Sequence, residues 1–252
     1  MSSFVSRPNL PEDTKALLIG EKYAELLGKR LAELGLDPIF VPENPDIDIR
    51  LSGHADLSAL HAGGERVYLA PYLRGSGFAE RLSALGAELC YPQIKQERAY
   101  PGDAQLNLCL VGRELFYNKR SAAGEIVEYL TKSGEYRPWN GRQGYARCSM
   151  CIVSDRAVVC SDQGMHRAAV SAGLDALLIE PGYIALDGFA HGFIGGAAFK
   201  LGRSVLAFTG RLYGHPSCDR ILDFLRAHDI EPVYITDRPI FDIGSTIPIT
   251  EK

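Results

Sequence analysis

The sequence predicts one α/β domain over residues 1–252, folded as a five-bladed α/β propeller of ββαβ units with pseudo-fivefold symmetry. Three observations lead to this fold class. The order strand, turn, strand, helix, strand recurs along the chain, every copy mixes one helix with strands, and the two chain ends hold complementary parts of one further unit. The N- and C-terminal segments are therefore expected to share one blade. The alternative is a doubly wound sheet, in which βα units also resemble one another.

The first complete unit occupies residues 50–93. Strands are predicted at 50–62 and 66–71, on either side of a Gly-Gly-Glu turn. Apolar residues at helical spacing predict a helix at 77–87, and a return strand follows at 87–93. This unit sets the pattern with which the rest of the chain is compared.

The same order recurs in three further segments and, in pieces, at the chain ends. The complete units are 104–137, 146–182 and 190–236, with helices predicted at 121–134, 163–173 and 215–228. The N-terminal pieces are a strand, a helix and a strand at 15–20, 21–35 and 36–42, and the C-terminal piece is a leading strand at 241–249. We expect this last strand to pair with the N-terminal unit and to close the ring.

Composition is that of a globular protein, with 46% hydrophobic and 23% charged residues. The formal net charge of −4 gives no electrostatic reason to expect nucleic acid or an anionic membrane as a partner. No apolar run approaches the roughly 20 residues that span a bilayer, and the N-terminal residues lack a signal-peptide pattern. We therefore expect a cytoplasmic protein. The oligomeric state stays open, with a homodimer as one alternative.

The six cysteines do not form a disulfide framework in a chain of 252 residues. Most are expected to be buried thiols that behave as small apolar side chains. Cys148 and Cys151 are the exceptions, because they form a C-x-x-C motif.

In a ring of such units, the leading strand of each unit points towards a common axis. Polar residues on these strands are therefore expected to meet at one site. They are His54, Asp56, Asn107, Cys148, Cys151, His191, Asp242 and Ser245.

The segment Gly53-His54-Ala55-Asp56 is predicted to be a strand, so that His54 and Asp56 project from the same face. A neighbouring carboxylate can orient an imidazole or raise its pKa. The competing interpretation is a surface histidine that happens to lie near an aspartate.

The run Gln143-Gly144-Tyr145-Ala146-Arg147-Cys148-Ser149-Met150-Cys151 permits several interpretations. Structural zinc normally takes four ligands, and a redox C-x-x-C normally opens a helix after a strand. The segment 146–154 is predicted to be a strand instead. A nucleophilic thiolate with Arg147 as its positive neighbour fits better, two packed thiols being the alternative.

These motifs resemble those of the pentein fold of guanidino-modifying enzymes: arginine deiminases, dimethylarginine hydrolases and amidinotransferases. In that family an H-x-D motif carries an acid/base histidine and a substrate-binding aspartate, and a cysteine on a late strand is the nucleophile. His54-Ala55-Asp56 is similar to the first motif, and 144–151 is similar to the nucleophile run with Cys148 at the reactive position. The sequence as a whole also resembles an uncharacterised bacterial domain family of that fold.

The sequence departs from the family pattern in chain order and in its acidic residues. The nucleophile is central rather than near the C-terminus, as in a circularly permuted relative. The family's E-G-G-D motif is matched either by Asp242-Ile243-Gly244-Ser245, which keeps one acid, or by Ile194-Gly195-Gly196-Ala197, which keeps the glycines and no acid. This loss argues against plain arginine and favours a smaller amidine, a ureido group or a modified amino acid.

The resemblance implies a hydrolase or transferase that acts on a C–N bond of an amidine, guanidino or ureido small molecule through a covalent thio-intermediate, without a cofactor. Cys148 would attack, and His54 would protonate the leaving amine and then activate water. Asp56, Asp242, Asn107, Cys151 and Ser245 would bind the substrate. The alternatives are a non-catalytic scaffold that binds a small molecule or a protein, and a metal site formed by Cys148, Cys151 and His54.

Overall fold

The computed structural model describes residues 2–132 and 134–252. Within them the strands form five separate sheets. Four sheets have three strands each and follow one another along the chain, and the fifth combines strands from both chain ends. The mixed α/β character predicted from the sequence is therefore confirmed.

Each three-stranded sheet is built in the same way, from an antiparallel hairpin and a third strand that returns parallel to the hairpin's second strand. The crossover to the parallel strand is a helix, as such a connection requires. The three-stranded sheets with their crossover helices are β4 (Ala59–His61), β5 (Arg66–Leu69), α2 (Gly77–Ala84) and β6 (Glu88–Cys90); β7 (Cys109–Val111), β8 (Glu114–Tyr117), α3 (Gly124–Lys132) and β9 (Arg137–Asn140); β10 (Met150–Ile152), β11 (Ala157–Cys160), α5 (Gln163–Ser171) and β12 (Asp175–Leu178); and β13 (Ala198–Gly202), β14 (Val205–Phe208), α6 (Cys218–Ala227) and β15 (Glu231–Tyr234).

The remaining sheet joins the two ends of the chain, in the order β1-β16-β2-β3. Its members are β1 (Ser3–Phe4), β2 (Thr14–Gly20), β3 (Asp37–Val41) and β16 (Ile247–Glu251), with α1 (Ala24–Glu33) as the crossover helix. β16 pairs antiparallel with β2, and β2 pairs parallel with β3. The predicted pairing of the C-terminal strand with the N-terminal unit is thus confirmed, although the strand begins at Ile247 rather than at 241.

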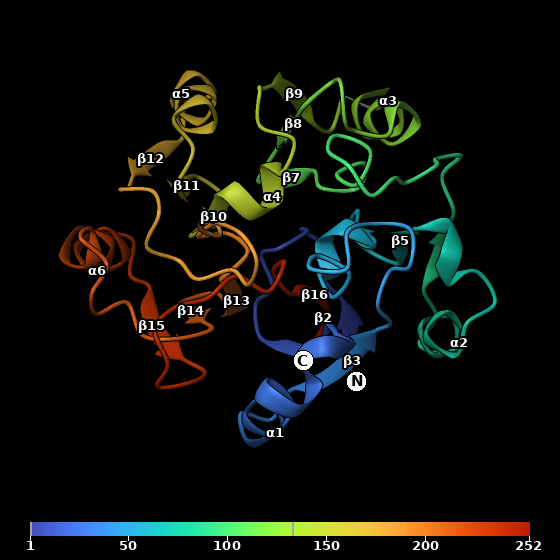
Figure 1. The fold of residues 1–252 in the computed structure, drawn as a ribbon, viewed down its shortest axis with the longest axis horizontal. Coiled ribbons are helices and arrows are strands. Elements are labelled where there is room, and N and C mark those ends of the chain that lie inside the picture. Colours follow the sequence, from blue (N-terminus) through green and yellow to red (C-terminus); the bar gives the residue numbers. More distant parts are fainter. Residues whose placement is uncertain (1, 133) are drawn as a thin grey trace.

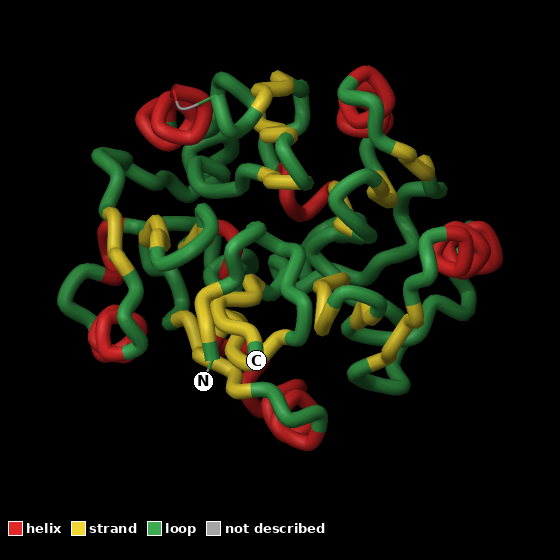
Figure 2. The backbone as a smooth tube through the Cα atoms, turned by 180° about the vertical axis from the view of Figure 1, so that it is seen from behind, coloured by secondary structure: helices red, strands yellow, loops and turns green. Residues whose placement is uncertain are grey.

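The helices lie outside the sheets. Figures 1 and 2 show α1, α2, α3, α5 and α6 around the rim, with the strands inside them and the two termini side by side. Their apolar faces explain this placement, because α6 buries Ile221 and Leu225, one turn apart, against the sheet. Capping fixes two of the starts, since Ser76 accepts a hydrogen bond from the N–H of Ala79 and Asp162 accepts one from that of Met165.

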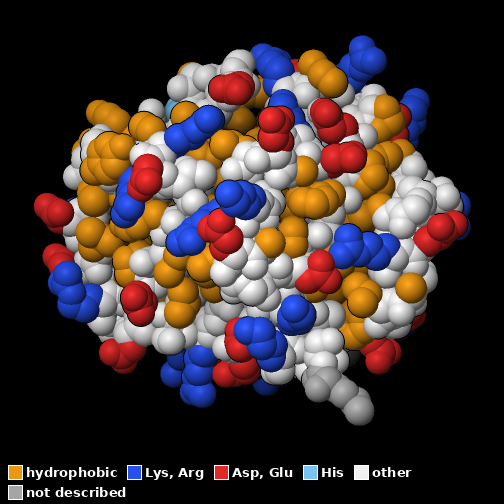
Figure 3. Space-filling model, turned by 90° about the horizontal axis from the view of Figure 1, so that it is seen from below, with side chains coloured by type: hydrophobic (Ala, Val, Ile, Leu, Met, Phe, Trp, Pro, Cys, Tyr) orange, Lys and Arg blue, Asp and Glu red, His pale blue; other side chains and the backbone are white. Residues whose placement is uncertain are grey.

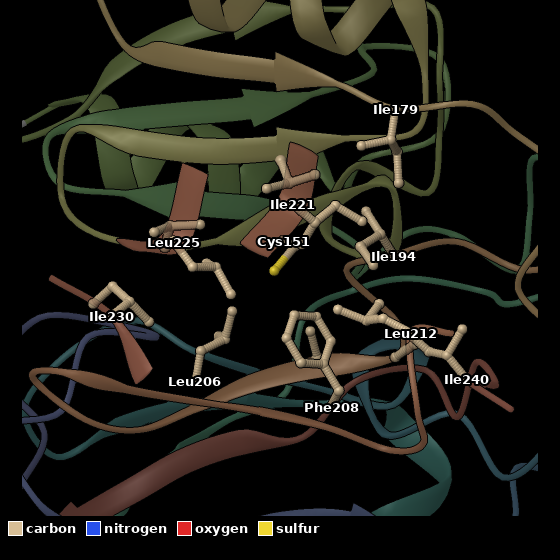
Figure 4. Close-up of a cluster of buried hydrophobic side chains, with 14 of the residues drawn as sticks. Cys151, Ile179, Ile194, Leu206, Phe208, Leu212, Ile221, Leu225, Ile230 and Ile240 are labelled. Carbon is tan, nitrogen blue, oxygen red and sulfur yellow. The ribbon is translucent and has the colours of Figure 1, made fainter. Parts of the chain in front are cut away.

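The buried apolar side chains show how the sheets follow one another in space. Five hydrophobic clusters each draw on two sheets, and together they link the sheets in a closed cycle. The pairs are the terminal sheet with β4–β6, β4–β6 with β7–β9, β7–β9 with β10–β12, β10–β12 with β13–β15, and β13–β15 with the terminal sheet. Figure 4 shows the cluster between β10–β12 and β13–β15, in which Leu206 and Phe208 meet Ile221 and Leu225.

Four short helical segments complete the chain: the 3-10 turns η1 (Glu21–Tyr23), η2 (Ala55–Leu57) and η3 (Pro71–Leu73), and the helix α4 (Ala146–Ser149). α4 lies near the middle of the molecule in Figure 1. Within the described residues, no helix is long and apolar enough to cross a membrane. On the face seen in Figure 3, acidic and basic side chains alternate without a region of one sign.

Candidate active site

Cys148 lies in the helical turn α4 and not in a strand, as the sequence had suggested. The side chain of Asn107 explains the turn, because its Oδ1 accepts hydrogen bonds from the backbone N–H of Arg147 (2.8 Å) and of Cys148 (3.3 Å). Its Nδ2 donates to Cys148 Sγ at 3.3 Å. Asn107, from the segment before β7, therefore holds both the start of α4 and the thiol.

His54 and Asp56 are also outside any strand. His54 precedes the 3-10 turn η2, and Asp56 lies inside it, so the predicted same-face geometry of a strand is wrong. The two residues nevertheless reach the same place. The Cys148 thiol donates a hydrogen bond to Asp56 Oδ2 at 3.0 Å, and the ring nitrogens, carboxylate oxygens and sulfur of the three residues offer atoms within 4.8 Å of one another.

Asp242 approaches this cluster from the loop before β16. Its carboxylate accepts backbone hydrogen bonds from Phe193 and Gly244, both at 2.8 Å. The glycines around it are required by close packing. A Cβ at Gly196 would overlap the Asp242 carboxylate. Gly244 has a φ of +69°, and a Cβ at this position would overlap His54. The Asp242 side chain therefore packs against the backbone of the segment Gly192–Gly196.

Two polar atoms of the cluster have no hydrogen-bond partner among the described residues. They are Nε2 of His54 and Oδ1 of Asp56, and both residues are almost fully buried. Leaving a buried polar atom unpaired costs about 1–3 kcal/mol. Such a cost is typical of a site where an incoming ligand supplies the missing partner.

Burial determines the protonation of the cluster. It raises the pKa of Asp56 to about 7, against the hydrogen bond from Cys148 that lowers it. Burial, together with the charges of Asp56 and Asp242, raises the pKa of the Cys148 thiol well above its ordinary value. Burial also lowers the pKa of His54, although Asp242 opposes this shift. At neutral pH the free protein therefore has a thiol and a neutral imidazole.

A pocket of about 270 Å³ opens onto the cluster. His54, Cys148 and Asp242 line it together with aromatic and aliphatic side chains: Leu51, Tyr145, Leu186, Phe189, Ala190, His191 and Phe193. Asp56 and Asn107 lie behind Cys148, in contact with its sulfur. The structure thus brings together six of the eight residues that the sequence had placed around a common axis.

The other two residues lie elsewhere. Cys151 is on β10, and its sulfur points into the apolar cluster of Figure 4, where burial raises the pKa of its thiol to about 12. Ser245 is fully buried, and its hydroxyl donates to the carbonyl oxygen of Thr246. The structure does not bring Cys151 or Ser245 to the pocket. Cys151 points into the core from its strand, and the Ser245 hydroxyl is hydrogen-bonded to the backbone.

Arg147 is also placed differently from the expectation. Its guanidinium is buried and donates to the carbonyl oxygens of Gly195 (3.1 Å) and Met150 (3.3 Å). Arg147 therefore ties the Gly192–Gly196 segment to α4 and does not act as the thiol's positive partner.

The aromatic walls of the pocket were missed from the sequence. Tyr145 is hydrogen-bonded to Asp103 at 2.6 Å, and its ring lies 6.4 Å from that of Phe193. Tyr145 belongs to the run that carries Cys148, so its position next to the nucleophile motif was an available signal. Leu186, Phe189 and Phe193 come from an irregular loop, where no periodicity marks them.

His54, Asp56 and Cys148 are also the one group of potential metal ligands that stands out in the described chain. Nitrogen, oxygen and thiolate sulfur are all ligands that zinc accepts. The set could hold a cation with three protein ligands. Cys151, which the sequence had suggested as a ligand, lies in the core.

Comparison with protein families gives one match over most of the chain. A model described as a family of unknown function (DUF6873) matches residues 18–247. No curated protein matches the sequence.

Solved structures of similar fold include two amidinotransferases and an agmatine deiminase. SxtG, an amidinotransferase of the saxitoxin biosynthetic pathway from Microseira wollei, has a TM-score of 0.62 at 10% identity, with 98% of each chain covered. Inosamine-phosphate amidinotransferase StrB1 from Streptomyces griseus has a TM-score of 0.61 at 11% identity, covering 98% of this chain and 97% of that one. Agmatine deiminase from C. jejuni has a TM-score of 0.52 at 10% identity, covering 93% and 91%. The resemblance to the pentein superfamily is confirmed, and at this identity it concerns the fold.

Proposed function

The chain belongs to the family of unknown function DUF6873, and from its site we propose that it is a cysteine-dependent enzyme acting on a C–N bond of an amidine, guanidino or ureido small molecule. The observation that carries the proposal is the convergence of three segments far apart in the sequence. They place the Cys148 thiol on Asp56 and within 4.8 Å of an atom of His54. A nucleophile, a base and a carboxylate gathered in one buried cluster are the parts that covalent catalysis at a planar carbon needs.

The two acids favour the cationic members of this substrate class, an amidinium or a guanidinium. Asp56 and Asp242 both raise the pKa of Cys148, so an amidinium bound between them would offset their charge and favour the thiolate. The free Oδ1 of Asp56 would accept an amidinium N–H. Binding of the substrate would therefore create the nucleophile that the free protein lacks.

The first half of the reaction forms the covalent intermediate. Neutral His54 takes the proton of the Cys148 thiol, and the thiolate attacks the amidinium carbon to give a neutral tetrahedral adduct. The protonated His54 then gives its proton to the leaving nitrogen, the C–N bond breaks, and an amine departs. Cys148 remains attached to a cationic thioimidate carbon.

The second half restores the thiol. Neutral His54 takes a proton from water, and the hydroxide adds to the same carbon. Collapse of this adduct breaks the C–S bond as the C=O bond forms, and the hydroxyl proton passes to the sulfur, so that an amide or urea leaves and Cys148 is again a thiol. His54 then releases the proton it took from water to the solvent and is neutral again. An amine in place of water would make the reaction a transfer.

We further interpret the five sheets as the blades of one propeller-like domain spanning the chain. The cyclic order of the hydrophobic clusters supports this interpretation, because each sheet packs on two neighbours. The site then lies where segments from all five units meet.

A non-catalytic binding scaffold is the second candidate, favoured by the raised pKa and the burial of Cys148 in the free protein. The two candidates differ in the response of this thiol to a cation. 2-Chloroacetamidine and 2-chloroacetamide have nearly the same shape, but only the first is cationic.

The test is the rate of alkylation by each reagent, followed by mass spectrometry of the intact protein and its peptides. The enzyme proposal expects 2-chloroacetamidine to modify Cys148 at least tenfold faster than 2-chloroacetamide, and Asp56→Asn to abolish this preference. Cys151, three residues away in the core, is the internal control and should stay unmodified. Equal rates for the two reagents at Cys148 would overturn the proposal.

The metal alternative has a separate test. Protein purified without added metal and incubated with zinc should be dialysed and analysed for its metal content beside a Cys148→Ser variant. Stoichiometric zinc in the wild type that is absent from the variant would favour a metal site. If the wild type retains no zinc, the metal alternative is excluded.

A further inference from the structure

We propose that the pocket over Cys148 selects an amidinium or guanidinium whose substituent is a compact apolar group, such as a single aromatic ring, without a carboxylate or a second charge. This inference rests on the proposed function, since it names the substrate class of the same site. It comes from the contrast between the charged floor of the pocket and its apolar walls.

The floor recognises the cationic head. Asp242 lines the pocket, Asp56 lies behind Cys148, and both carboxylates lie near the sulfur. Asp242 already accepts two backbone N–H groups, so its position is fixed before a ligand arrives. A planar cation over Cys148 would pair with these acids, whereas a neutral molecule of the same shape would not.

The walls recognise the rest of the molecule. Leu51 and Leu186 lie in one apolar group with Tyr145, and the Tyr145 ring continues to Phe193. The imidazole of His191 meets the edge of Phe193 with ring centroids 5.9 Å apart. Offset and edge-to-face rings are the surroundings that an aromatic substituent prefers.

Two cations lie near the pocket without lining it: Lys22, whose charge acts on His54, and Arg50, whose guanidinium is already engaged. Arg50 stacks over Phe189 at 4.3 Å from the ring centroid and donates to Asp48 and to the carbonyl oxygen of Gly188. A substrate carboxylate directed into the walls would face apolar rings and the acids of the floor. It would lose its hydration without gaining a partner, which disfavours arginine-like molecules.

The volume limits the substituent. At about 270 Å³ the pocket lies just below the range typical of drug-sized ligands. One ring with its amidinium fits this scale, and an extended side chain with a charged end would need to leave through the mouth.

The experiment compares the binding of four probes to the full chain by calorimetry and by protection of Cys148 from 2-chloroacetamidine. Benzamidine has the head and a ring, acetamidine has the head alone, agmatine adds a cationic tail, and arginine adds a carboxylate. We expect benzamidine to bind at least tenfold more tightly than each of the other three. Tighter binding of arginine or agmatine, or no binding of any probe, would overturn the inference.

Phe193 offers a variant that separates the ring from the acid. Because Phe193 holds Asp242 through its backbone N–H, Phe193→Ala removes the wall and leaves this hydrogen bond possible. The variant should lose about tenfold in benzamidine affinity, with acetamidine affinity unchanged, and Phe193→Leu should recover part of the loss. Tyr213→Ala, which removes an exposed ring outside the pocket, should change neither.

The outcomes also separate this inference from the proposed function. If benzamidine binds selectively but 2-chloroacetamidine does not label Cys148, the specificity holds and catalysis fails. If Cys148 is labelled by the cationic reagent but the four probes bind equally, catalysis holds and the apolar specificity fails.

Discussion

At the scale of single residues, the distribution of protons in the free protein defines the site. The Cys148 thiol donates a 3.0 Å hydrogen bond to Asp56, and burial disfavours charge on both groups and on His54. Negative charge on the carboxyl and thiol groups of this cluster is therefore unfavourable in the free protein, and a bound cation would stabilise it. This arrangement has a consequence for stability that can be measured without knowing the substrate.

Asp56→Asn should change how stability depends on pH. The pKa of Asp56 is raised from 3.8 to about 7 in the folded protein. Between these pH values the folded state binds more protons than the unfolded chain, so this group lowers the free energy of unfolding as pH rises. The asparagine does not titrate. The difference in unfolding free energy, variant minus wild type, should therefore rise by on the order of 3 kcal/mol from pH 4 to pH 7.

Urea unfolding at one-unit pH steps measures this difference. His54, with its lowered pKa, contributes the opposite slope in both proteins and largely cancels from the comparison. Asp48→Asn is a suitable control, because the pKa of this exposed carboxyl is lowered to about 2 by Arg50 and its contribution is constant above pH 4. A constant difference between Asp56→Asn and wild type would contradict the expectation.

At the scale of elements, the turn α4 decides where Cys148, the proposed nucleophile, lies. α4 has only four residues and no capping side chain of its own, so it depends on Asn107 from a neighbouring unit. In a strand at this position successive side chains would alternate between the two faces, so Cys148 and Cys151 would point to opposite faces. The helical turn ends before β10, and only Cys151 follows the strand pattern.

Asn107→Ala should therefore affect both stability and the thiol. Loss of the acceptor for the N–H groups of Arg147 and Cys148 should cost about 1–2 kcal/mol of unfolding free energy. The rate of 2-chloroacetamidine labelling at Cys148 should fall at least tenfold, because the sulfur loses its hydrogen-bond donor and its position.

Asn118→Ala is the matched control. The Asn118 side chain accepts a hydrogen bond from the N–H of Arg120 and donates one to the carbonyl oxygen of Arg142, and none of these residues lines the pocket. Its loss should cost a similar free energy of unfolding with labelling of Cys148 unchanged. If Asn107→Ala loses stability but labels at the wild-type rate, Asn107 does not position the nucleophile.

At the scale of the whole molecule, the sheet formed by both chain ends closes the cycle of packed sheets. β16 pairs with β1 on one side and with β2 on the other, and its Ile247 and Ile249 are buried. The cluster that contains them joins this sheet to β4–β6. Removal of β16 would therefore open one sheet and uncover one of the five hydrophobic clusters.

Truncation after Thr246 should abolish cooperative thermal unfolding, whereas a circular permutant should keep it. Ser3 and Glu251 are paired residues of β1 and β16, so a short Gly-Ser linker can join the chain ends. New termini between Gly173 and Leu174 would fall between α5 and β12. Calorimetry and circular dichroism compare the two proteins, and a permutant as disordered as the truncation would contradict a closed ring.

Much of this architecture could be predicted from the sequence, because it depends on local signals. Helices such as α2 and α6 have apolar residues at helical spacing, and strands such as β5 and β11 are short apolar runs next to turns. The recurrence of these signals predicted that His54, Asn107, Cys148 and Asp242 would meet. It did not predict how their side chains would be presented.

The irregular segments account for the errors. Residues 50–58 have strand-like composition but fold as turns with η2, and the glycines at 195 and 196 were seen only as one of two matches to the family's E-G-G-D motif. In the structure Gly192 and Gly196 leave room for Asp242, which comes from a loop 46 residues beyond Gly196. Contacts of that kind leave no periodic trace in the sequence.

The sequence by itself determined the repeating unit, the sharing of one sheet by the two chain ends, and the identity of the residues brought together. These follow from hydrophobic periodicity and turn chemistry, which act over a few neighbouring residues. Only the tertiary structure decided that Asp56 holds the thiol, that Cys151 belongs to the core, and that aromatic rings wall the pocket. Those features depend on burial and on hydrogen bonds between distant segments, whose energies exist only once the sheets have packed.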